Sequence, residues 1–141
     1  MSPQLQPGHT FDWTYTVPPR ATVPQLYADT AFCRDMPDVL ATGYMVGMME
    51  LACIAGIMPF MDWPREQSVG TMVSFRHLAA TPPGLTLAVK GKVTAVEGRR
   101  IQFEIDAWDG IDKICEGTHE RTVIDAARFS DKIARKAGVA A

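Results

Sequence analysis

The chain has few of the features that mark export or metal binding. Its three cysteines, Cys33, Cys53 and Cys115, form no CxxC pair and no metal-ligand spacing, and their odd number argues against a disulfide framework. The segment 1–9 has neither the basic start nor the apolar run of a secretory signal. We therefore expect reduced thiols and a cytoplasmic protein, with no metal site.

Charge of one sign is also scarce. The formal net charge is −2, and lysine and arginine are spread along the 141 residues, so no basic stripe predicts binding to nucleic acid or to an anionic membrane. The longest apolar stretch, Tyr44 to Met61, is interrupted by glycine, glutamate and proline and predicts no membrane span. The length favours a single domain over 1–141, and 47% hydrophobic residues suffice for a globular core.

The clearest predicted element is a helix from Gly43 to Met58. Thr42 is a plausible N-cap, and Pro59 lies just beyond the end of the helix. Nearly all the side chains of this helix are apolar, which is typical of a helix buried on every side. Glu50 is the exception, in the middle of the run.

Hydrophobicity alternates with a period of two before and after this helix. The expected strands are Thr10 to Val17, Ser68 to Ala80, Leu85 to Val96, Ile101 to Trp108 and Ile111 to Ile124, and Ala126 to Lys136 is expected to form a short terminal helix or tail. Tight turns, including a two-residue Asp109-Gly110 hairpin, predict that the last four strands form an antiparallel meander.

One face of such a sheet must cover the helix. We therefore predict an α+β fold in which a curved antiparallel sheet wraps around a long central helix, the hot-dog arrangement. A sheet of this kind leaves edge strands exposed, and pairing two sheets edge to edge in a homodimer is the simplest way to protect them.

Three polar side chains could carry chemistry. A buried carboxylate such as Glu50 must be paired, hydrogen-bonded or protonated, unless it lies on an exposed stripe or at a dimer contact. Thr42 is about 80° from Glu50 around the helix, so the two could border one cleft, although a plain helix cap is the stronger interpretation from the sequence. His77 shares a strand face with apolar residues, where a satisfied core histidine is commoner than a catalyst. A second histidine, His119, has the same strand parity as Arg121.

A hydroxyl, a carboxylate and an imidazole suffice for acyl transfer. The spacing alone is a weak signal, because the chain contains no GxSxG elbow, HExxH, GxGxxG or P-loop.

The motifs and their order resemble the fluoroacetyl-coenzyme A thioesterase family from about Phe11 to Lys136. Five segments carry the likeness: 41–53 (ATGYMVGMMELAC), 68–71 (SVGT), 77–85 (HLAATPPGL), 96–100 (VEGRR) and 116–121 (EGTHER). The resemblance implies a hot-dog homodimer that hydrolyses a short acyl-CoA to an acid and free coenzyme A. It also implies that no metal or redox cofactor is needed, since coenzyme A is part of the substrate.

The resemblance also implies roles for single residues. The family's catalytic threonine, glutamate and histidine match Thr42, Glu50 and His77. The glycine and the arginine implicated in holding the acyl end match Gly70 and Arg121, for which a strand bulge and a surface ion pair are the structural alternatives.

Two further positions concern the acyl pocket. Val23 lies in a segment similar to a pocket-lining one, with plain core packing as the alternative. The fluoroacetyl enzymes carry an aromatic lid residue before the helix, and alignment on Pro37 puts Met36 at that place, where its flexible side chain lacks a rigid aromatic face. The natural acyl group could therefore be another short chain.

Two other functions stay open from the sequence. One is a hot-dog hydratase acting on enoyl thioesters, which would leave coenzyme A attached to the product. The other is a non-catalytic acyl-CoA-binding module, which would have no need for all three of Thr42, Glu50 and His77.

Overall fold

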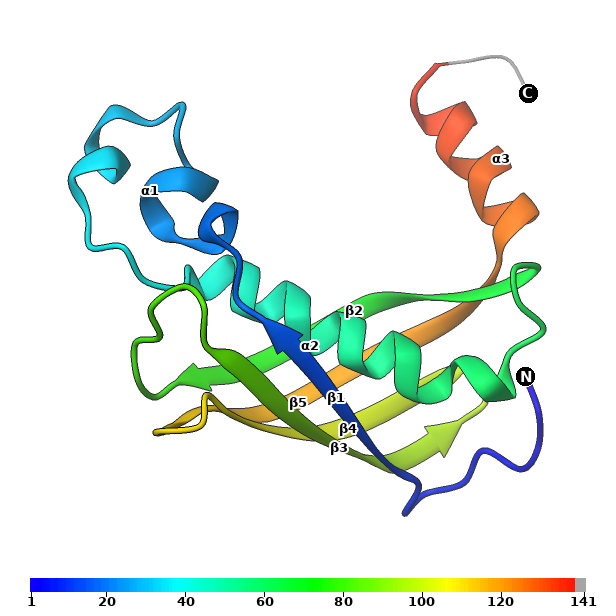
Figure 1. The fold of residues 1–141 in the computed structure, drawn as a ribbon. Coiled ribbons are helices and arrows are strands. Elements are labelled where there is room, and N and C mark those ends of the chain that lie inside the picture. The colour runs from blue at the N-terminus through cyan, green and yellow to red at the C-terminus, as the bar shows by residue number, and fades with distance from the viewer. Residues whose placement is uncertain (139–141) are drawn as a thin grey trace.

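A computed structural model describes residues 1–138 and shows a five-stranded antiparallel sheet curled around one long helix (Figure 1). The strands are β1 (Thr10–Thr16), β2 (Glu66–His77), β3 (Thr86–Glu97), β4 (Arg100–Trp108) and β5 (Lys113–Asp125). The helices are α1 (Val23–Leu26), α2 (Thr42–Ile57) and α3 (Ala126–Lys136), with short 3₁₀ helices at Pro19–Ala21, Ala31–Asp35 and Met58–Phe60. The predicted α+β fold is confirmed.

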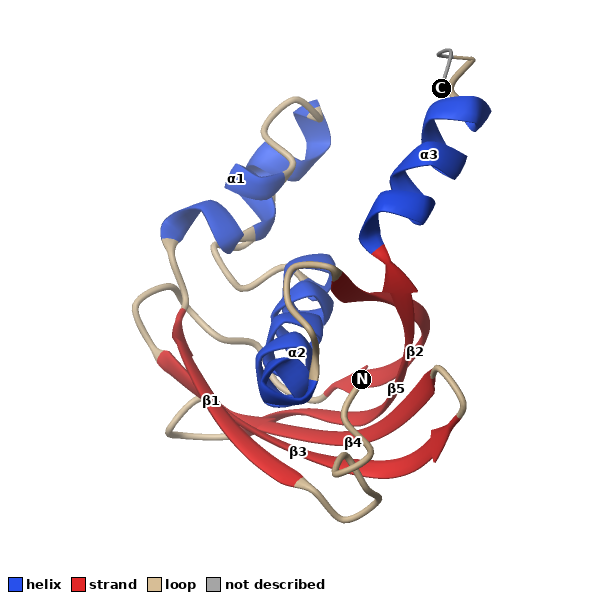
Figure 2. Ribbon diagram, turned by 90° about the vertical axis from the view of Figure 1, so that its right-hand side faces the viewer, coloured by secondary structure: helices blue, strands red, loops and turns tan. Residues whose placement is uncertain are grey.

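The predicted four-strand meander is wrong in one connection. The strand order is β1-β3-β4-β5-β2, so only β3, β4 and β5 form a meander, while β2 pairs with β5 and β1 pairs with β3. This order puts β1 and β2 at opposite edges of the sheet, and they flank α2, which connects them in the chain (Figure 2). The segment 78–85 therefore crosses from one edge toward the other instead of turning back in a hairpin.

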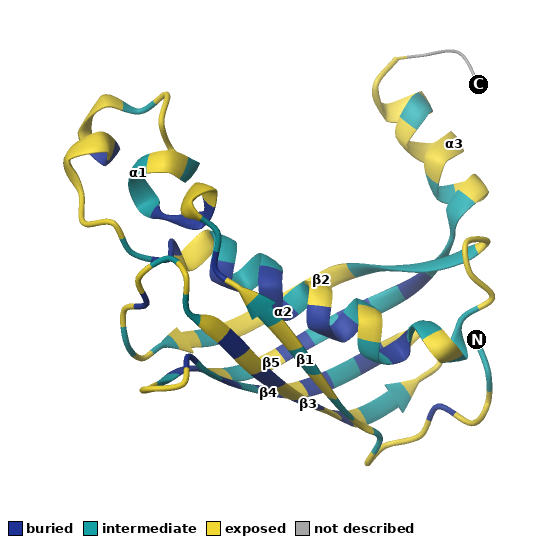
Figure 3. Cartoon of the chain, in the orientation of Figure 1, coloured by how far each residue is buried: buried dark blue, intermediate teal, exposed yellow. Residues whose placement is uncertain are grey.

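Burial follows the expected period of two on the central strands. Buried residues alternate with exposed or intermediate ones along most of β3 and β4 (Figure 3), and the buried ones form one hydrophobic core with those of α2. On α2 the buried residues recur every three or four positions: Met45, Met48, Met49, Ala52, Cys53 and Ile57. This stripe packs on the sheet as an amphipathic helix does.

The other face of α2 is apolar but not covered. Leu51 is 45% exposed, so the prediction of a helix buried on every side is wrong for the single chain. By length and composition alone the segment 42–60 is apolar enough to cross a membrane, but its packing in the hollow of the sheet is that of a core helix.

The connection between β4 and β5 differs from the predicted two-residue hairpin. Asp109 is buried, and its carboxylate accepts hydrogen bonds from the backbone amides of Ile111 (2.9 Å) and Asp112 (2.8 Å) and from the Thr81 hydroxyl (2.9 Å). Burial alone would raise the pKa of Asp109, but these hydrogen bonds hold it below its ordinary value. The aspartate side chain thus organises a longer loop, and β5 begins at Lys113.

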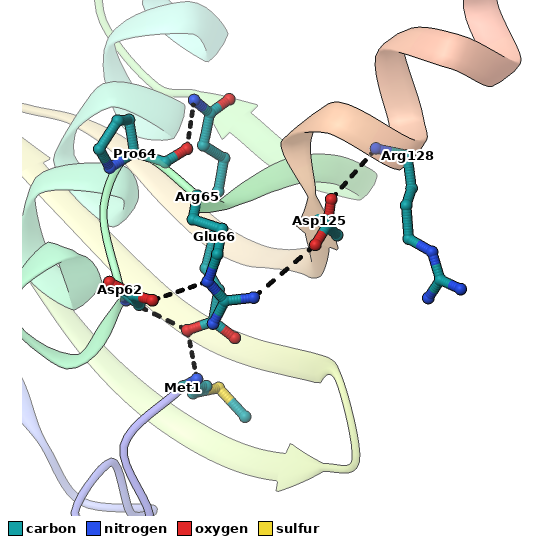
Figure 4. Close-up of polar contacts among 8 residues, drawn as sticks. Met1, Asp62, Pro64, Arg65, Glu66, Asp125 and Arg128 are labelled. Carbon is teal, nitrogen blue, oxygen red and sulfur yellow. Dashed lines mark hydrogen bonds and ion pairs between the residues drawn. The ribbon is translucent and has the colours of Figure 1, made fainter.

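Polar contacts connect Met1 and Asp125 to the residues around the start of β2 (Figure 4). The Glu66 carboxylate accepts from the amino terminus of Met1 and from the Asp62 amide. Arg65 pairs with Asp62 (2.7 Å) and reaches Asp125 (3.7 Å). Asp125 also caps α3, which projects away from the sheet (Figure 1).

The ring of Phe11 lies between two glycines, and this close packing gives a stability prediction. Phe11 faces Gly91 across the β1–β3 pair, and a Cβ at either Gly91 or Gly56 of α2 would overlap the ring. Gly91→Ala should therefore lower the free energy of unfolding by about 1–3 kcal/mol, the usual cost of overpacking, measured by urea denaturation. Gly47→Ala, where nothing lies within 4 Å, is the control and should leave stability equal or higher. Equal stability of Gly91→Ala and wild type would contradict this packing.

Candidate active site

Thr42 and His77 lie in direct contact. The Thr42 Oγ1 is 2.8 Å from the His77 Nδ1, which joins the start of α2 to the end of β2. The predicted cap role of Thr42 is wrong: Ala41 is the N-cap residue, its side chain makes no capping bond, and Thr42 is the first residue of the helix. The Thr42 hydroxyl is directed to the histidine instead.

Backbone hydrogen bonds hold these two residues in place. The Ala41 amide donates to the Ala21 carbonyl (2.9 Å) and the Leu40 amide donates to the Thr81 carbonyl (2.8 Å), which fixes the entry into α2. The N-cap residue Ala41 makes no side-chain hydrogen bond to the backbone amides in the first turn of α2. Such amides can stabilise a developing negative charge.

His77 is half-buried at one end of the sheet. Burial lowers the pKa of its imidazole, so the ring is neutral near pH 7 and able to accept a proton. Its Nε2 is buried and makes no hydrogen bond within residues 1–138. A satisfied core histidine, the commoner alternative, is therefore not what the structure shows. Val23 lines the same surface hollow as Thr42 and His77.

Glu50 belongs to a second cluster. The Arg121 Nη1 donates to the Glu50 Oε1 (3.1 Å), the Arg121 Nε donates to the Ser68 Oγ (2.8 Å), and the Arg121 Nη2 donates to the Ser68 carbonyl (2.9 Å). The Arg121 side chain is only 4% exposed, so the alternative of a surface ion pair is wrong. The Arg121 Nη1 also lies 3.1 Å from the Nε2 of the buried His119.

Gly70 makes room for this cluster. The register of β2 against β5 shifts between Gly70 and Met72, so the strand bulge considered from the sequence is present. A Cβ at Gly70 would overlap the Glu50 Oε1 and would approach the Arg121 Nη1 to 3.4 Å. A larger residue at position 70 would therefore push apart the carboxylate and the guanidinium.

The single chain does not bring the three predicted catalytic residues together. Glu50 and Arg121 line a hollow of about 690 Å³ on the uncovered face of α2, whereas Thr42 and His77 line a different one. Eight residues separate Thr42 from Glu50, or about 12 Å along a helix. Met36 is 46% exposed and lines neither hollow.

Two members of the second cluster lie outside the predicted site: Ser68 was not considered from the sequence, and His119 was considered only as a second candidate histidine. Ser68 contacts Arg121 only because β2 pairs with β5, and the 53 positions between these residues hide the contact from local patterns. The shared strand parity of His119 and Arg121 is the sequence signal that points to the histidine. Among the described residues, no group of three or more His, Cys, Asp or Glu side chains is placed to hold a metal.

The chain is similar to known thioesterases over nearly its whole length. The family model for fluoroacetyl-CoA-specific thioesterases matches residues 24–127. A fluoroacetyl-CoA thioesterase from Streptantibioticus cattleyicolor is 43% identical over 136 residues, covering 96% of this chain and 97% of the relative.

Solved structures give the same relationship. A fluoroacetyl-CoA thioesterase matches with a TM-score of 0.90 at 43% identity, over 94% of this chain and 97% of that one. A thioesterase superfamily member from Thermus thermophilus matches with a TM-score of 0.83 at 28% identity, over 98% of this chain and 96% of that one. The predicted hot-dog fold is confirmed, and the chain belongs to the fluoroacetyl-CoA-specific thioesterase family.

Proposed function

We propose that the protein hydrolyses short-chain acyl-CoA thioesters to a carboxylic acid and free coenzyme A. The observation that carries this proposal is the 2.8 Å contact between the Thr42 hydroxyl and the neutral imidazole of His77, a nucleophile beside a base. Fluoroacetyl-CoA is the candidate substrate, because a relative carries that name and a variant of a relative has been solved with fluoroacetate and CoA.

The reaction takes two acyl-transfer steps. The Thr42 Oγ attacks the thioester carbonyl carbon while its proton passes to the His77 Nδ1, and the first-turn amides of α2 stabilise the oxyanion. The C–S bond then breaks, and His77 returns the proton to the departing thiolate. Water then attacks the acyl-threonine carbonyl carbon while the Glu50 carboxylate accepts its proton. The bond from this carbon to the Thr42 Oγ breaks, and the proton passes to the Oγ, which releases the acid and restores the threonine. No metal or redox cofactor is needed for these steps.

A second copy of the chain completes the site in this proposal. Residues 70–74 of the edge strand β2 are all exposed, including the apolar Met72 and Val73. Antiparallel pairing of two β2 strands about a two-fold axis at Ser74 would place Gly70 close to His77 of the partner subunit. The Glu50 cluster of one chain would then face the Thr42–His77 pair of the other, which gives a homodimer with two composite sites.

The compartment follows from the cysteines. Cys33, Cys53 and Cys115 are free and buried, which supports a reducing compartment, and we propose the cytoplasm.

The role of Glu50 gives the first activity prediction. Glu50→Gln keeps the shape of the side chain but removes the base, so thiol release from acyl-CoA by the folded protein should fall by at least about a hundredfold. Glu104→Gln, an exposed change on β4, is the matched control and should retain wild-type turnover. Near-wild-type turnover of Glu50→Gln would refute the mechanism. Product that keeps its coenzyme A would instead favour the hydratase.

The composite site gives a second prediction. Light scattering should give twice the 15.5 kDa chain mass, and mixing inactive Glu50→Gln with inactive His77→Ala should restore activity. In a mixed dimer both changes fall in one site and the other site is intact, so roughly a quarter of the wild-type sites should return after random exchange. If all three residues act within one chain, mixing restores nothing.

The lid position gives a third prediction. Met36 bends more easily than an aromatic ring, so the wild type should hydrolyse fluoroacetyl-CoA but discriminate only weakly against acetyl-CoA. Met36→Phe should raise the ratio of kcat/KM for the two esters, by roughly ten- to two-hundredfold at most. Phe32→Leu, on the same exposed segment, is the control. A wild type that already discriminates fully, with a ratio unmoved by Met36→Phe, would place selectivity elsewhere.

A further inference from the structure

His119 is a fully buried imidazole next to the Glu50 cluster, and the proposed mechanism does not use it. Its ring is held by Phe75 and Phe103, whose centroids each lie 6.1 Å away. Its Nδ1 lies 2.6 Å from the Met72 carbonyl oxygen, and its Nε2 lies 3.1 Å from the Arg121 Nη1. Both ring nitrogens therefore have a partner.

These partners fix the protonation state of the ring. A guanidinium has only donors, so the His119 Nε2 must accept from Arg121. A carbonyl oxygen only accepts, so the His119 Nδ1 must donate to Met72. The ring is thus neutral with its single proton on Nδ1. Burial lowers the pKa of His119, which agrees with this state.

The contact matters because Arg121 uses the same nitrogen for Glu50. The Arg121 Nη1 donates to the His119 Nε2 and to the Glu50 Oε1, each at 3.1 Å, while the Ser68 oxygens hold the other two nitrogens of the guanidinium. A carboxylate at position 119 would compete with Glu50 for the arginine, and a cation there would repel it. The geometry calls for a neutral acceptor.

We propose that His119 is a positioning residue: as a neutral acceptor it fixes the Arg121 Nη1 and so sets the place of the Glu50 carboxylate, without touching the substrate. This inference rests on the proposed function, because Glu50 is taken as the base. Since His119 acts through Arg121 and Glu50, its removal should matter only while Glu50 is present.

The test is a double-mutant cycle. His119→Met keeps much of the volume but removes the acceptor, and kcat should fall about tenfold or more in wild type while leaving the residual rate of Glu50→Gln unmoved. His119→Gln, whose amide oxygen can accept from Arg121, should recover most of the loss. Equal losses in both backgrounds, or no rescue by glutamine, would show a role in packing alone and overturn the proposal.

A measurement on the unmodified protein keeps the inference testable if a variant fails to fold. Nitrogen-15 NMR of the wild-type protein should show His119 protonated on Nδ1 and bare on Nε2 near neutral pH. A proton on Nε2 would contradict the geometry. A fully active Glu50→Gln enzyme would refute the proposed function. If Glu50→Gln is inactive but the single variant His119→Met is fully active, only the role of His119 is refuted.

Discussion

The burial of the Arg121 guanidinium is the constraint on which the rest of the site depends. A guanidinium keeps its charge, so burying it requires hydrogen-bond acceptors and an opposite charge beside it. Ser68 supplies two oxygens, His119 supplies a neutral nitrogen, and Glu50 supplies the opposite charge. Gly70 lacks the side chain that would block this contact. The Arg121 guanidinium on β5 thus bonds residues of both α2 and β2, and these contacts fix the position of the Glu50 carboxylate.

The fold separates this cluster from the Thr42–His77 pair. Both groups border the uncovered side of the molecule, where the outer face of α2 and the edge of β2 present apolar side chains such as Leu51 and Val73. An open sheet edge and an uncovered helix face are costly for a single chain in water, and both are removed if a second copy binds there. In the proposed dimer, the association that protects these surfaces also assembles the catalytic site.

Local sequence patterns were sufficient for the elements that depend on local physics. The period of two located the strands, and an apolar run followed by Pro59 located α2; together they gave the α+β fold. These patterns failed where a side chain forms a hydrogen bond that periodicity does not reveal. The Thr42 hydroxyl bonds His77 instead of capping its own helix, and the Asp109 carboxylate organises a longer loop in place of the predicted hairpin. The burial of Arg121 and the contribution of Ser68 depend on the β2–β5 pairing, which no local pattern specifies. The family resemblance pointed to Thr42, Glu50 and His77 but not to their separation into two clusters.

In the proposed mechanism, Thr42 and His77 open the thioester by transferring the acyl group to the threonine. The most direct measurement is to mix fluoroacetyl-CoA with the Glu50→Gln protein, in which the second step is slowed, and to follow thiol release and protein mass together. We expect about one thiol per site to be released rapidly and an acyl group to be found on Thr42 by peptide mass spectrometry. Thiol release by the wild type with no acyl group on Thr42 in this variant would show that Thr42 is not the nucleophile.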